Sequence, residues 1–479
     1  MKTVNPHINK VNPHIFRGYD LRGIVPDDLN EKTVRLIMKG FVTMLFEKQI
    51  KEVVVGRDNR NSSEEIEKYV IDELLKNGVD VYSIGKSLSQ IVYWSQYHFL
   101  SKACIMVTAS HNPKDYNGFK LGRSFSDTLE SEEIKKLRSY VEKGNFKKYD
   151  RQAQFVKKDI FEDYKNDLLK RVTIDKKFKV VVEGSNTYSG EFVSQILEDT
   201  GCSVIRQNCE PNGNFPLGTP DPTENDVLER LSKRVLKEKA DLGFTYDADG
   251  DRVGIVDDKG QSIWNDNLVS SFAQDVLYYE PGGTIVYNTL CSKQTADVIR
   301  SSGGNPLMWL TGHSFIKAKL KQEKAAFGGE LSGHMFFVDN FYGHDDGAFA
   351  SLRLLQYLSR TNQTLSETVA KMPKYVSSPE IKFGCADEIK FDFIKTKITK
   401  EFKNLFGKTA SYIDIDGIRA DTKDEMVIIR ASQNGPYLTV KFEGKTQKKY
   451  NDLKKKIKAI LKKYKEVDFS SGVNKDALD

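Results

Sequence analysis

The chain has 479 residues, 39% apolar and 29% charged, a composition that excludes wholesale disorder and suggests about three domains or four small ones. Basic residues exceed acidic residues by 73 to 67, a small excess that gives no indication of a nucleic-acid partner. The five cysteines form no CxxC pair, and the start of the chain contains no apolar signal segment. We therefore expect reduced thiols, a cytoplasmic location and no membrane partner.

Short β-branched runs, each followed by a loop of Gly, Ser, Asn or Asp, recur along the chain. They lie at 53–58, 104–112, 179–186, 242–251, 284–292 and 325–334. Amphipathic helical segments separate them; in one of these, Ser62 and Glu65 fit a capping box and the apolar stripe stops at Gly78. This alternation predicts α/β layers with mainly parallel sheets, in which ligands gather at the carboxyl ends of the strands.

The last part of the chain has a different pattern. Two strand-like runs at 426–429 and 438–442 precede a Lys-rich helix. One face of that helix carries Leu453, Ile457, Ile460 and Leu461. We expect a surface helix packed on a small α+β domain, in preference to a nucleic-acid-binding arm.

The polar loop TASHNP at 108–113 directly follows an apolar run. Ser110 lies where a hydroxyl at the end of a strand could attack a substrate or carry a phosphoryl group. Its context is not the G-x-S-x-G elbow of α/β-hydrolases. A capping turn is the alternative, and local chemistry slightly favours it, because Ser, Asn and Pro are common turn residues.

The loop DADGDR at 247–252 places aspartates at alternate positions, so that Asp247, Asp249 and Asp251 point to one side of an extended segment. Like charges at such short distances repel one another unless a cation compensates them, and carboxylate oxygens suit Mg²⁺. An EF-hand is excluded, because Arg252 and Asp258 stand where it needs Gly and Glu. A solvated acidic turn is the remaining alternative.

The loop GELSGH at 329–334 offers a carboxylate, a hydroxyl and an imidazole between glycines. This composition suits hydrogen bonds to several sugar hydroxyls, and a glycine-rich turn with a helix cap is an equal alternative. The loop TGHS at 311–314 is similar and weaker.

The loop RASQNGP at 430–436 lies between the two late strand-like runs and contains no acidic residue. Its arginine could bind a phosphate through two N–H groups, while Ser, Asn and a Gly amide add donors. An ordinary hairpin loop is the leading alternative. No Walker A or G-x-G-x-x-G sequence supports a nucleotide site.

Together these loops, preceded by FRGYDLRG at 16–23, resemble in order those of the α-D-phosphohexomutase superfamily, most closely its bacterial phosphomannomutase/phosphoglucomutase group. The resemblance implies an α/β protein with three related mixed α/β domains and a smaller C-terminal α+β domain around a central cleft. We place these domains at 1–157 with the phosphoserine loop, 158–258 with the metal loop, 259–376 with the sugar loop and 377–479 with the phosphate loop.

The resemblance also implies a role for each site residue. Ser110 would carry the phosphoryl group and, with Asp247, Asp249 and Asp251, would bind Mg²⁺. Further catalytic roles fall to His111, Lys120, Arg22 and Arg252. Substrate contacts fall to Tyr19, His313, Glu330, Ser332, His334, Arg430, Ser432 and Asn434.

The implied reaction interconverts hexose 1-phosphate and hexose 6-phosphate, of mannose or glucose, through a phosphoserine enzyme and a 1,6-bisphosphate that also serves as activator. Phosphoryl transfer needs in-line positioning and charge neutralisation above all. Lys120, Arg22 and Arg252 would offset anionic charge, and Lys120 or His111 would move the proton of the reacting hydroxyl. We expect sugar phosphates as the ligands and a monomer or weak dimer.

Two departures from the family pattern bear on sugar preference. Leu290 and Leu310 stand where close members carry lysine, which weakens phosphate binding unless Lys293 or Lys317 substitutes. Phosphoglucosamine mutase is the alternative activity, and Leu331 argues against it, since that branch usually carries Gln there. A sugar-phosphate-binding relative without turnover is the other alternative.

Overall fold

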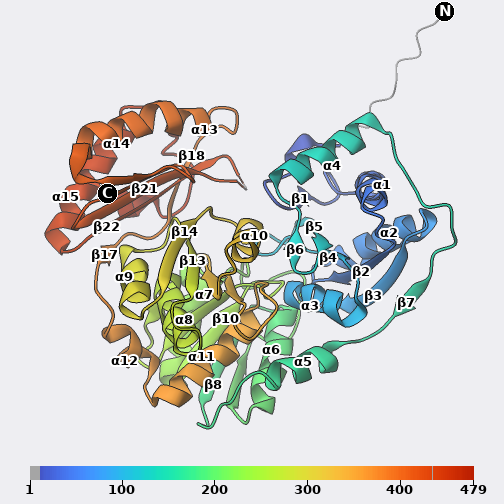
Figure 1. The fold of residues 1–479 in the computed structure, drawn as a ribbon, viewed down its shortest axis with the longest axis horizontal. Helices are drawn as coiled ribbons and strands as arrows, with labels where there is room; N and C mark the ends of the chain where they lie inside the picture. Colours follow the sequence, from blue (N-terminus) through green and yellow to red (C-terminus); the bar gives the residue numbers. More distant parts are fainter. Residues whose placement is uncertain (1–10, 434) are drawn as a thin grey trace, which may run out of the picture. The chain divides into compact units, whose positions relative to one another are not determined.

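The protein, seen here as a computed structural model that describes residues 11–433 and 435–479, forms two compact units over that part of the chain (Figure 1). The first unit combines the chain up to Trp264 with Ser332–Thr368. The second combines Asn265–Leu331 with Val369–Asp479. Each unit contains two sheets built on different strand patterns.

The first sheet of unit one is mixed, in the order β1-β5-β4-β2-β3-β7, with β6 paired to β5. Its strands are β1 Leu21–Ile24, β2 Glu52–Arg57, β3 Asp80–Lys86, β4 Ala103–Val107, β5 Tyr116–Ser124, β6 Asp127–Thr128 and β7 Phe155–Lys157. The helices around it are α1 Glu31–Glu47, α2 Ser63–Lys76, α3 Ser89–Phe99 and α4 Ser131–Lys143. The parallel pairs β4-β2-β3 match the predicted layers, and their carboxyl ends lead into polar loops.

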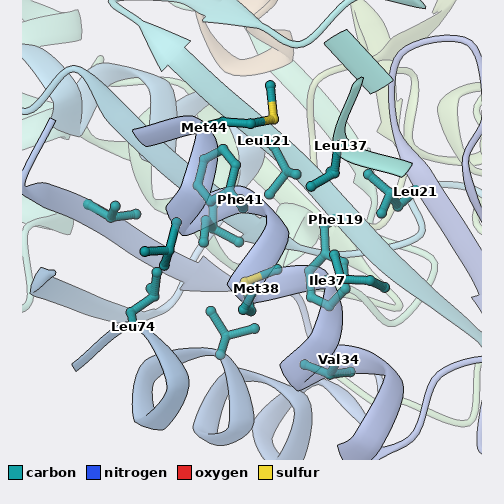
Figure 2. Close-up of a cluster of buried hydrophobic side chains, with 14 of the residues drawn as sticks. Leu21, Val34, Ile37, Met38, Phe41, Met44, Leu74, Phe119, Leu121 and Leu137 are labelled. Atoms are coloured by element: carbon teal, nitrogen blue, oxygen red, sulfur yellow. The ribbon is translucent and has the colours of Figure 1, made fainter. Parts of the chain in front are cut away.

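Alternating side chains of β2 divide the core between the two faces of this sheet. Val53 and Val55 pack with α1, α2 and α4 in one apolar cluster, part of which Figure 2 shows around Phe41. Gly56 faces α3 instead, where an added Cβ would lie 2.8 Å from a methyl of Val92. The β-branched run at 53–58 is therefore buried on both faces, as a central parallel strand requires.

The helix predicted after this run is present as α2, but its predicted capping box is wrong. Ser62 has helical backbone angles and makes no side-chain cap. Its hydroxyl accepts a hydrogen bond from the Asn117 side chain at 2.9 Å instead, and Glu65 accepts from Tyr69. A partner 55 residues away in sequence has replaced the local cap.

The second sheet of unit one has the order β12-β11-β10-β8-β9. Its strands are β8 Lys179–Glu183, β9 Ser203–Gln207, β10 Leu242–Tyr246, β11 Val253–Asp257 and β12 Ser262–Ile263. The other elements of this part are α5 Phe161–Leu169, α6 Tyr188–Asp199, α7 Asn225–Glu238, α11 Gly347–Thr361, α12 Leu365–Ala370 and β16 Met335–Phe337. Strand β10 runs parallel to β8 and antiparallel to β11, so the acidic loop 247–252 is the turn of a hairpin.

Unit two begins with the parallel strands β14-β13-β15. Its elements are α8 Asn265–Tyr279, β13 Thr284–Asn288, α9 Lys293–Ser301, β14 Asn305–Trp309, α10 His313–Glu323 and β15 Phe327–Gly329. Each predicted run here is a shorter strand followed by a polar loop, since the run 284–292 ends as β13 at Asn288. The loops at 289–292 and 311–314 therefore leave neighbouring parallel strands at the same edge.

The other sheet of unit two is antiparallel, in the order β17-β22-β21-β20-β19 with β18 paired to β22. Its elements are β17 Val376–Ser377, β18 Ile381–Gly384, α13 Lys390–Phe393, a π-helical turn Ile394–Ile398, α14 Thr399–Phe406, β19 Ser411–Ile413, β20 Ile418–Asp421, β21 Glu425–Ala431, β22 Tyr437–Gly444 and α15 Gln447–Leu461. The apolar stripe of α15 is buried while most of its lysines are exposed, which confirms the predicted surface helix. Among the described residues, no helix is both long and apolar enough to cross a membrane.

Replacing Phe41 by Ala should lower the free energy of unfolding by about 3–5 kcal/mol, because its ring is 1% exposed and would leave a cavity in the first core. Phe46 lies on the same helix but is 38% exposed, so Phe46→Ala should cost about 1 kcal/mol or less. Urea denaturation followed by circular dichroism measures both. Equal losses in the two variants would contradict this account of the core.

Candidate active site

Ser110 lies in the loop that follows β4, with its backbone in the left-handed region at φ +50°. Its amide donates to the hydroxyl of Thr108 at 2.8 Å. Its own hydroxyl donates to Asp247 Oδ2 at 2.8 Å and lies 3.0 Å from His111 Nδ1. The loop is a turn, but the serine hydroxyl does not cap a helix. It donates a hydrogen bond to a carboxylate 137 residues away in the sequence. The tertiary contact therefore favours the chemical interpretation of this loop.

The side chains of Asp247, Asp249 and Asp251 converge at the turn between β10 and β11. Each is 0% exposed, and single ligand atoms from all of them lie within 4.8 Å of one another. Gly250 gives the turn its shape, because it has φ +76° and an added Cβ would lie 2.9 Å from Gln90. A solvated acidic turn is thereby excluded, and the convergence predicted from alternate positions is confirmed.

Lys120 supplies positive charge to this buried acidic cluster. Its ammonium, on β5, bonds Asp249 Oδ2 at 2.6 Å and also Asp251. Burial by itself would lower the pKa of Lys120, but Asp249 and Asp251 raise it overall. Burial alone would raise the pKa of Asp249, yet Lys120 lowers it to about 2. Burial and the neighbouring Asp249 raise the pKa of Asp247 well above its ordinary value.

These residues fit a bound divalent cation. The Oδ1 atoms of Asp249 and Asp251 are buried and accept no hydrogen bond from the described residues. Burial and the neighbouring aspartates raise the pKa of Asp247, so a bound cation would stabilise its charged form. Carboxylate oxygens at this spacing are a donor set that Mg²⁺ prefers. The cluster can therefore hold a cation, for which Asp249 and Asp251 would compete with Lys120.

Arg252 and His334 border the acidic cluster. Arg252 Nε donates to His334 Nε2 at 2.9 Å, and His334 Nδ1 lies 2.9 Å from Asp345 Oδ2. Asp251, His334 and Asp345 form a second buried group with metal-ligand spacing. The sequence patterns did not lead us to predict Asp345 as a site residue. The run His344-Asp345-Asp346 could have indicated it, because it groups an imidazole with two carboxylates. The structure thus brings His334 to the acidic loop.

Arg22 and Tyr19 come from the start of the chain. Arg22, on β1, is 8% exposed and pairs with Asp20 at 2.7 Å. Its guanidinium also donates to the Ala109 carbonyl at 3.3 Å and to the Asn112 side chain. Tyr19 is buried two residues before β1. Unit one therefore places Arg22 against the loop that carries Ser110.

Glu330, in unit two, is buried at the end of β15. Its Oε1 accepts the amide of Gly312 at 2.6 Å, directly before His313 at the start of α10. The two predicted sugar-binding loops of unit two are therefore joined by this hydrogen bond. Ser332, two residues after Glu330, is half-buried and belongs to unit one. The loop 329–334 thus has residues in both units.

The predicted phosphate loop is the turn of the antiparallel β21-β22 hairpin, which confirms the hairpin alternative for its backbone. Arg430 is 5% exposed and its Nε donates to Asp416 Oδ2 at 2.7 Å. Asp416 Oδ2 also accepts from the Thr289 hydroxyl at 2.9 Å and the Thr311 amide at 3.1 Å. Asp416, which no motif marks, therefore ties Arg430 to the loops after β13 and β14.

A buried lysine, Lys390, also holds this hairpin turn. Lys390 Nζ donates to the carbonyls of Ser432 at 2.6 Å and Gly435 at 2.8 Å. Its ammonium also contacts Asp387 at 2.6 Å. Asn434 lies outside the described residues. Lys390 is a second residue of this site that sequence reasoning missed, because a single lysine in a short helix gives no signal.

The two lysines considered as substitutes at the departures have different surroundings. Lys293 Nζ donates to the backbone carbonyls of Thr422 and, at 3.3 Å, Lys423. Lys317 is 1% exposed on α10. Leu290 is also buried, at 2% exposure. The ammonium of Lys293 is thus engaged by the loop after β20.

Comparison with known proteins finds family matches over successive parts of the chain. Three sequence models of phosphoglucomutase/phosphomannomutase match it: α/β/α domain I over residues 13–148, domain II over 162–260 and domain III over 264–375. These matches cover more than half of the chain. They include the Ser110 loop, the acidic loop and the loop 329–334.

Similar whole proteins carry the same names. The phosphomannomutase/phosphoglucomutase of Pseudomonas aeruginosa is 35% identical over 448 residues, which cover 94% of this chain and 95% of that protein. The phosphoglucomutase of Neisseria gonorrhoeae is 32% identical over 93% of this chain and 96% of its own. The crystal structure of a phosphoglucomutase/phosphomannomutase family protein from Burkholderia thailandensis superposes with a TM-score of 0.86 at 30% identity, covering 94% of this chain and 98% of that one.

The order of the loops, the matched domains and the relatives over nearly the whole length agree. The resemblance drawn from the ordered motifs is thereby confirmed, and so is the fold class of three α/β domains with a smaller sheet-containing C-terminal domain. The chain belongs to the phosphoglucomutase/phosphomannomutase family of the α-D-phosphohexomutase superfamily.

Proposed function

We propose that this enzyme interconverts the 1-phosphate and 6-phosphate of glucose, mannose or both, through a phosphoserine at Ser110 and a hexose 1,6-bisphosphate. The observation that carries the proposal is the 2.8 Å hydrogen bond from Ser110 to Asp247. It joins a serine at a strand end to a buried acidic cluster in a chain of this family. The names of its relatives support glucose and mannose phosphates as the substrates.

In the first half-reaction, the phosphoryl group on Ser110 Oγ passes to the free hydroxyl of a hexose monophosphate. The bond between phosphorus and Ser110 Oγ breaks as the bond to the sugar oxygen forms, and the hydroxyl proton leaves to a base. His111 suits that role, because its Nδ1 lies 3.0 Å from Ser110 Oγ. Lys120 suits charge compensation better, since its carboxylate partners hold its pKa high.

In the second half-reaction, the bisphosphate returns its other phosphoryl group to Ser110 Oγ and leaves as the isomeric monophosphate. The same base takes the proton from the Ser110 hydroxyl and returns a proton to the sugar oxygen that is released. The enzyme therefore ends as the phosphoserine form in which it started. Arg22 and Arg252 border the reacting groups as fixed positive charges and would offset the charge of the phosphoryl oxygens.

Mg²⁺ is the cation that we assign to Asp247, Asp249 and Asp251, with an oxygen of the Ser110 phosphate as a further ligand. When bound, it would neutralise charge on the phosphoryl group that is transferred. The protein's part is to keep the carboxylates buried and adjacent, and to keep Ser110 against Asp247. Hexose 1,6-bisphosphate is the activator that we expect, since it phosphorylates the serine.

We assign the remaining predicted contacts to two separate tasks. Glu330, Ser332, His334 and His313 would read sugar hydroxyls, and Tyr19 would contribute from the first domain. Arg430, Ser432 and Asn434 would hold the phosphate that is not transferred. The hydrogen bond from Arg430 Nε to Asp416 supports this, because it fixes the place of a cation in the predicted phosphate loop.

The domain limits 1–157, 158–258, 259–376 and 377–479 remain part of this proposal. So do a cytoplasmic location, for which the five buried cysteines are suitable, and a monomer or weak dimer. Sugar phosphates are the small-molecule partners in this scheme, and no step requires nucleic acid or membrane.

Wild-type protein with Mg²⁺ and glucose 1,6-bisphosphate should turn over glucose 1-phosphate or mannose 1-phosphate faster than glucosamine 1-phosphate. The purified enzyme should also carry a phosphate-sized adduct in intact-mass analysis, and Ser110→Ala should lack both the adduct and turnover. Faster turnover of the glucosamine compound would assign the alternative activity. An adduct on another residue would remove Ser110 from its role.

Asp249→Asn should abolish the rise in melting temperature that Mg²⁺ gives the wild type, because it removes a ligand from the cluster. We expect its turnover to fall by about 100-fold or more. Asp258→Asn is the matched control, since Asp258 lies just beyond the far end of the same hairpin and bonds Ser366. A normal Mg²⁺ response in Asp249→Asn would count against the metal assignment.

Arg430→Ala should raise KM for glucose and mannose 1-phosphates by similar factors, with a loss of about 1.5–3 kcal/mol for a charge-assisted contact. Glu330→Gln should instead change the ratio of the two turnover rates. Glucose and mannose differ in the direction of one hydroxyl group, and we assign Glu330 to the sugar hydroxyls. Steady-state kinetics on both substrates measures this, with Arg300→Ala, exposed on α9, as the control. Altered sugar preference in Arg430→Ala alone would reverse the two assignments.

A further inference from the structure

The loop that carries Ser110 is held by a buried arginine that no motif singles out. Arg60 lies between β2 and α2 and is 2% exposed. A guanidinium has five N–H groups, and Arg60 uses every one of them. Nε donates to Asp58 Oδ2 at 3.1 Å, Nη1 to the carbonyls of Pro113 at 2.6 Å and Tyr116 at 3.0 Å, and Nη2 to the carbonyls of Ser110 and Asn112, both at 2.7 Å.

The amide side of Ser110 is tied to the same anchor. Its N–H donates to Thr108 Oγ1 at 2.8 Å, and the Thr108 hydroxyl donates to Asp58 Oδ2 at 2.7 Å. Asp58 is 0% exposed and also accepts from the amide of Arg60. The N–H and C=O of Ser110 are thus both connected to the Asp58–Arg60 pair, through Thr108 on one side and directly on the other.

This double anchor fixes a backbone conformation that a serine does not prefer. Ser110 has φ +50°, a region that costs a non-glycine residue free energy. The carbonyl direction of a residue sets its ψ, and φ and ψ together set where the side chain points. By holding the N–H and the C=O, the anchor fixes the direction of the Cα–Cβ bond, from which Ser110 Oγ reaches Asp247 at 2.8 Å.

The anchor is itself covered by the part of the chain that carries the metal loop. The Phe215 ring covers the Arg60 guanidinium, with 5.2 Å between the ring centroid and Arg60 Cζ. Asn59 donates to the Asn186 carbonyl at 2.8 Å. The backbone at Gly213 approaches so closely that a Cβ there would lie 2.5 Å from the Asn59 carbonyl. The loop after β2 therefore connects the Ser110 loop to the neighbouring domain within unit one.

We propose that Arg60 is a positioning residue for phosphoryl transfer: it contacts no reacting atom and sets the place of the Ser110 hydroxyl through four backbone carbonyls of its loop. The inference rests on the proposed function for its catalytic consequence. Arginine is required because its planar fork reaches acceptors in two directions at once. A lysine has three donors on a single nitrogen and cannot span the four carbonyls.

The test compares Arg60→Met and Arg60→Lys with the wild type in the full chain. Misplacing a reacting group by about 1 Å can cost about 100-fold in rate, so kcat of Arg60→Met should fall by about that factor. The KM for the sugar phosphate should stay within about threefold, because Arg60 does not contact substrate. Arg60→Lys should recover part of the loss in kcat.

Arg57→Met is the matched control. Arg57 ends the same strand and pairs with Glu67 at 2.9 Å and Glu64 at 3.0 Å. We expect its kcat to stay within about threefold of the wild type, since none of its hydrogen bonds reaches the Ser110 loop. Equal losses of kcat in Arg57→Met and Arg60→Met would overturn the inference, and so would a wild-type kcat in Arg60→Met.

Amide hydrogen exchange provides a readout that does not depend on turnover. Exchange in the peptide 108–116 should speed up in Arg60→Met and not in Arg57→Met; unchanged exchange would overturn the inference. If Arg60→Met does not fold, Thr108→Val takes its place. We expect faster exchange in the same peptide and a kcat about tenfold lower than that of the wild type. Wild-type exchange and kcat in Thr108→Val would contradict the inference. A wild-type chain without mutase turnover would refute the proposed function, while the exchange comparison would still decide whether Arg60 holds the loop.

Discussion

Burying several aspartate carboxylates side by side is the constraint on which unit one depends. Like charges without water repel strongly, so Asp247, Asp249 and Asp251 need cations to stay together. Lys120 supplies part of the compensation, and the buried Oδ1 atoms of Asp249 and Asp251 accept no hydrogen bond from the described residues. The donor hydroxyl of Ser110 is drawn to the same cluster. The same negative charge that makes the cluster costly to bury makes it suited to a divalent cation.

In unit two, a buried carboxylate, Asp416, compensates a buried positive charge. The predicted phosphate loop carries Arg430, which is 5% exposed and so buried enough to require a charged partner. Asp416 provides that partner and, with the same oxygen, holds Thr289 and Thr311. Lys390 then fixes the hairpin turn through backbone carbonyls. In both units, buried charged side chains hold together loops that are far apart in sequence.

Much of this could be predicted from the amino-acid sequence. The β-branched runs predicted the parallel strands, since such strands are buried on both faces. Alternation within DADGDR predicted that its carboxylates converge, because side-chain direction in an extended segment repeats every two residues. The apolar stripe of the last helix predicted its buried face. The ordered loops together identified the family, which single loops could not do, since each was also an ordinary turn.

Other features depend on contacts that no local pattern encodes. Ser62 lost its predicted cap because Asn117, on a neighbouring strand, took its hydroxyl. Arg60 and Asp416 have no motif around them, and each acquires its role from partners many residues away. The sequence by itself therefore determined which strands end in loops able to do chemistry, because periodicity and composition are local. Only the tertiary structure decided which charges those loops share, since burial and pairing arise when the sheets and loops pack together.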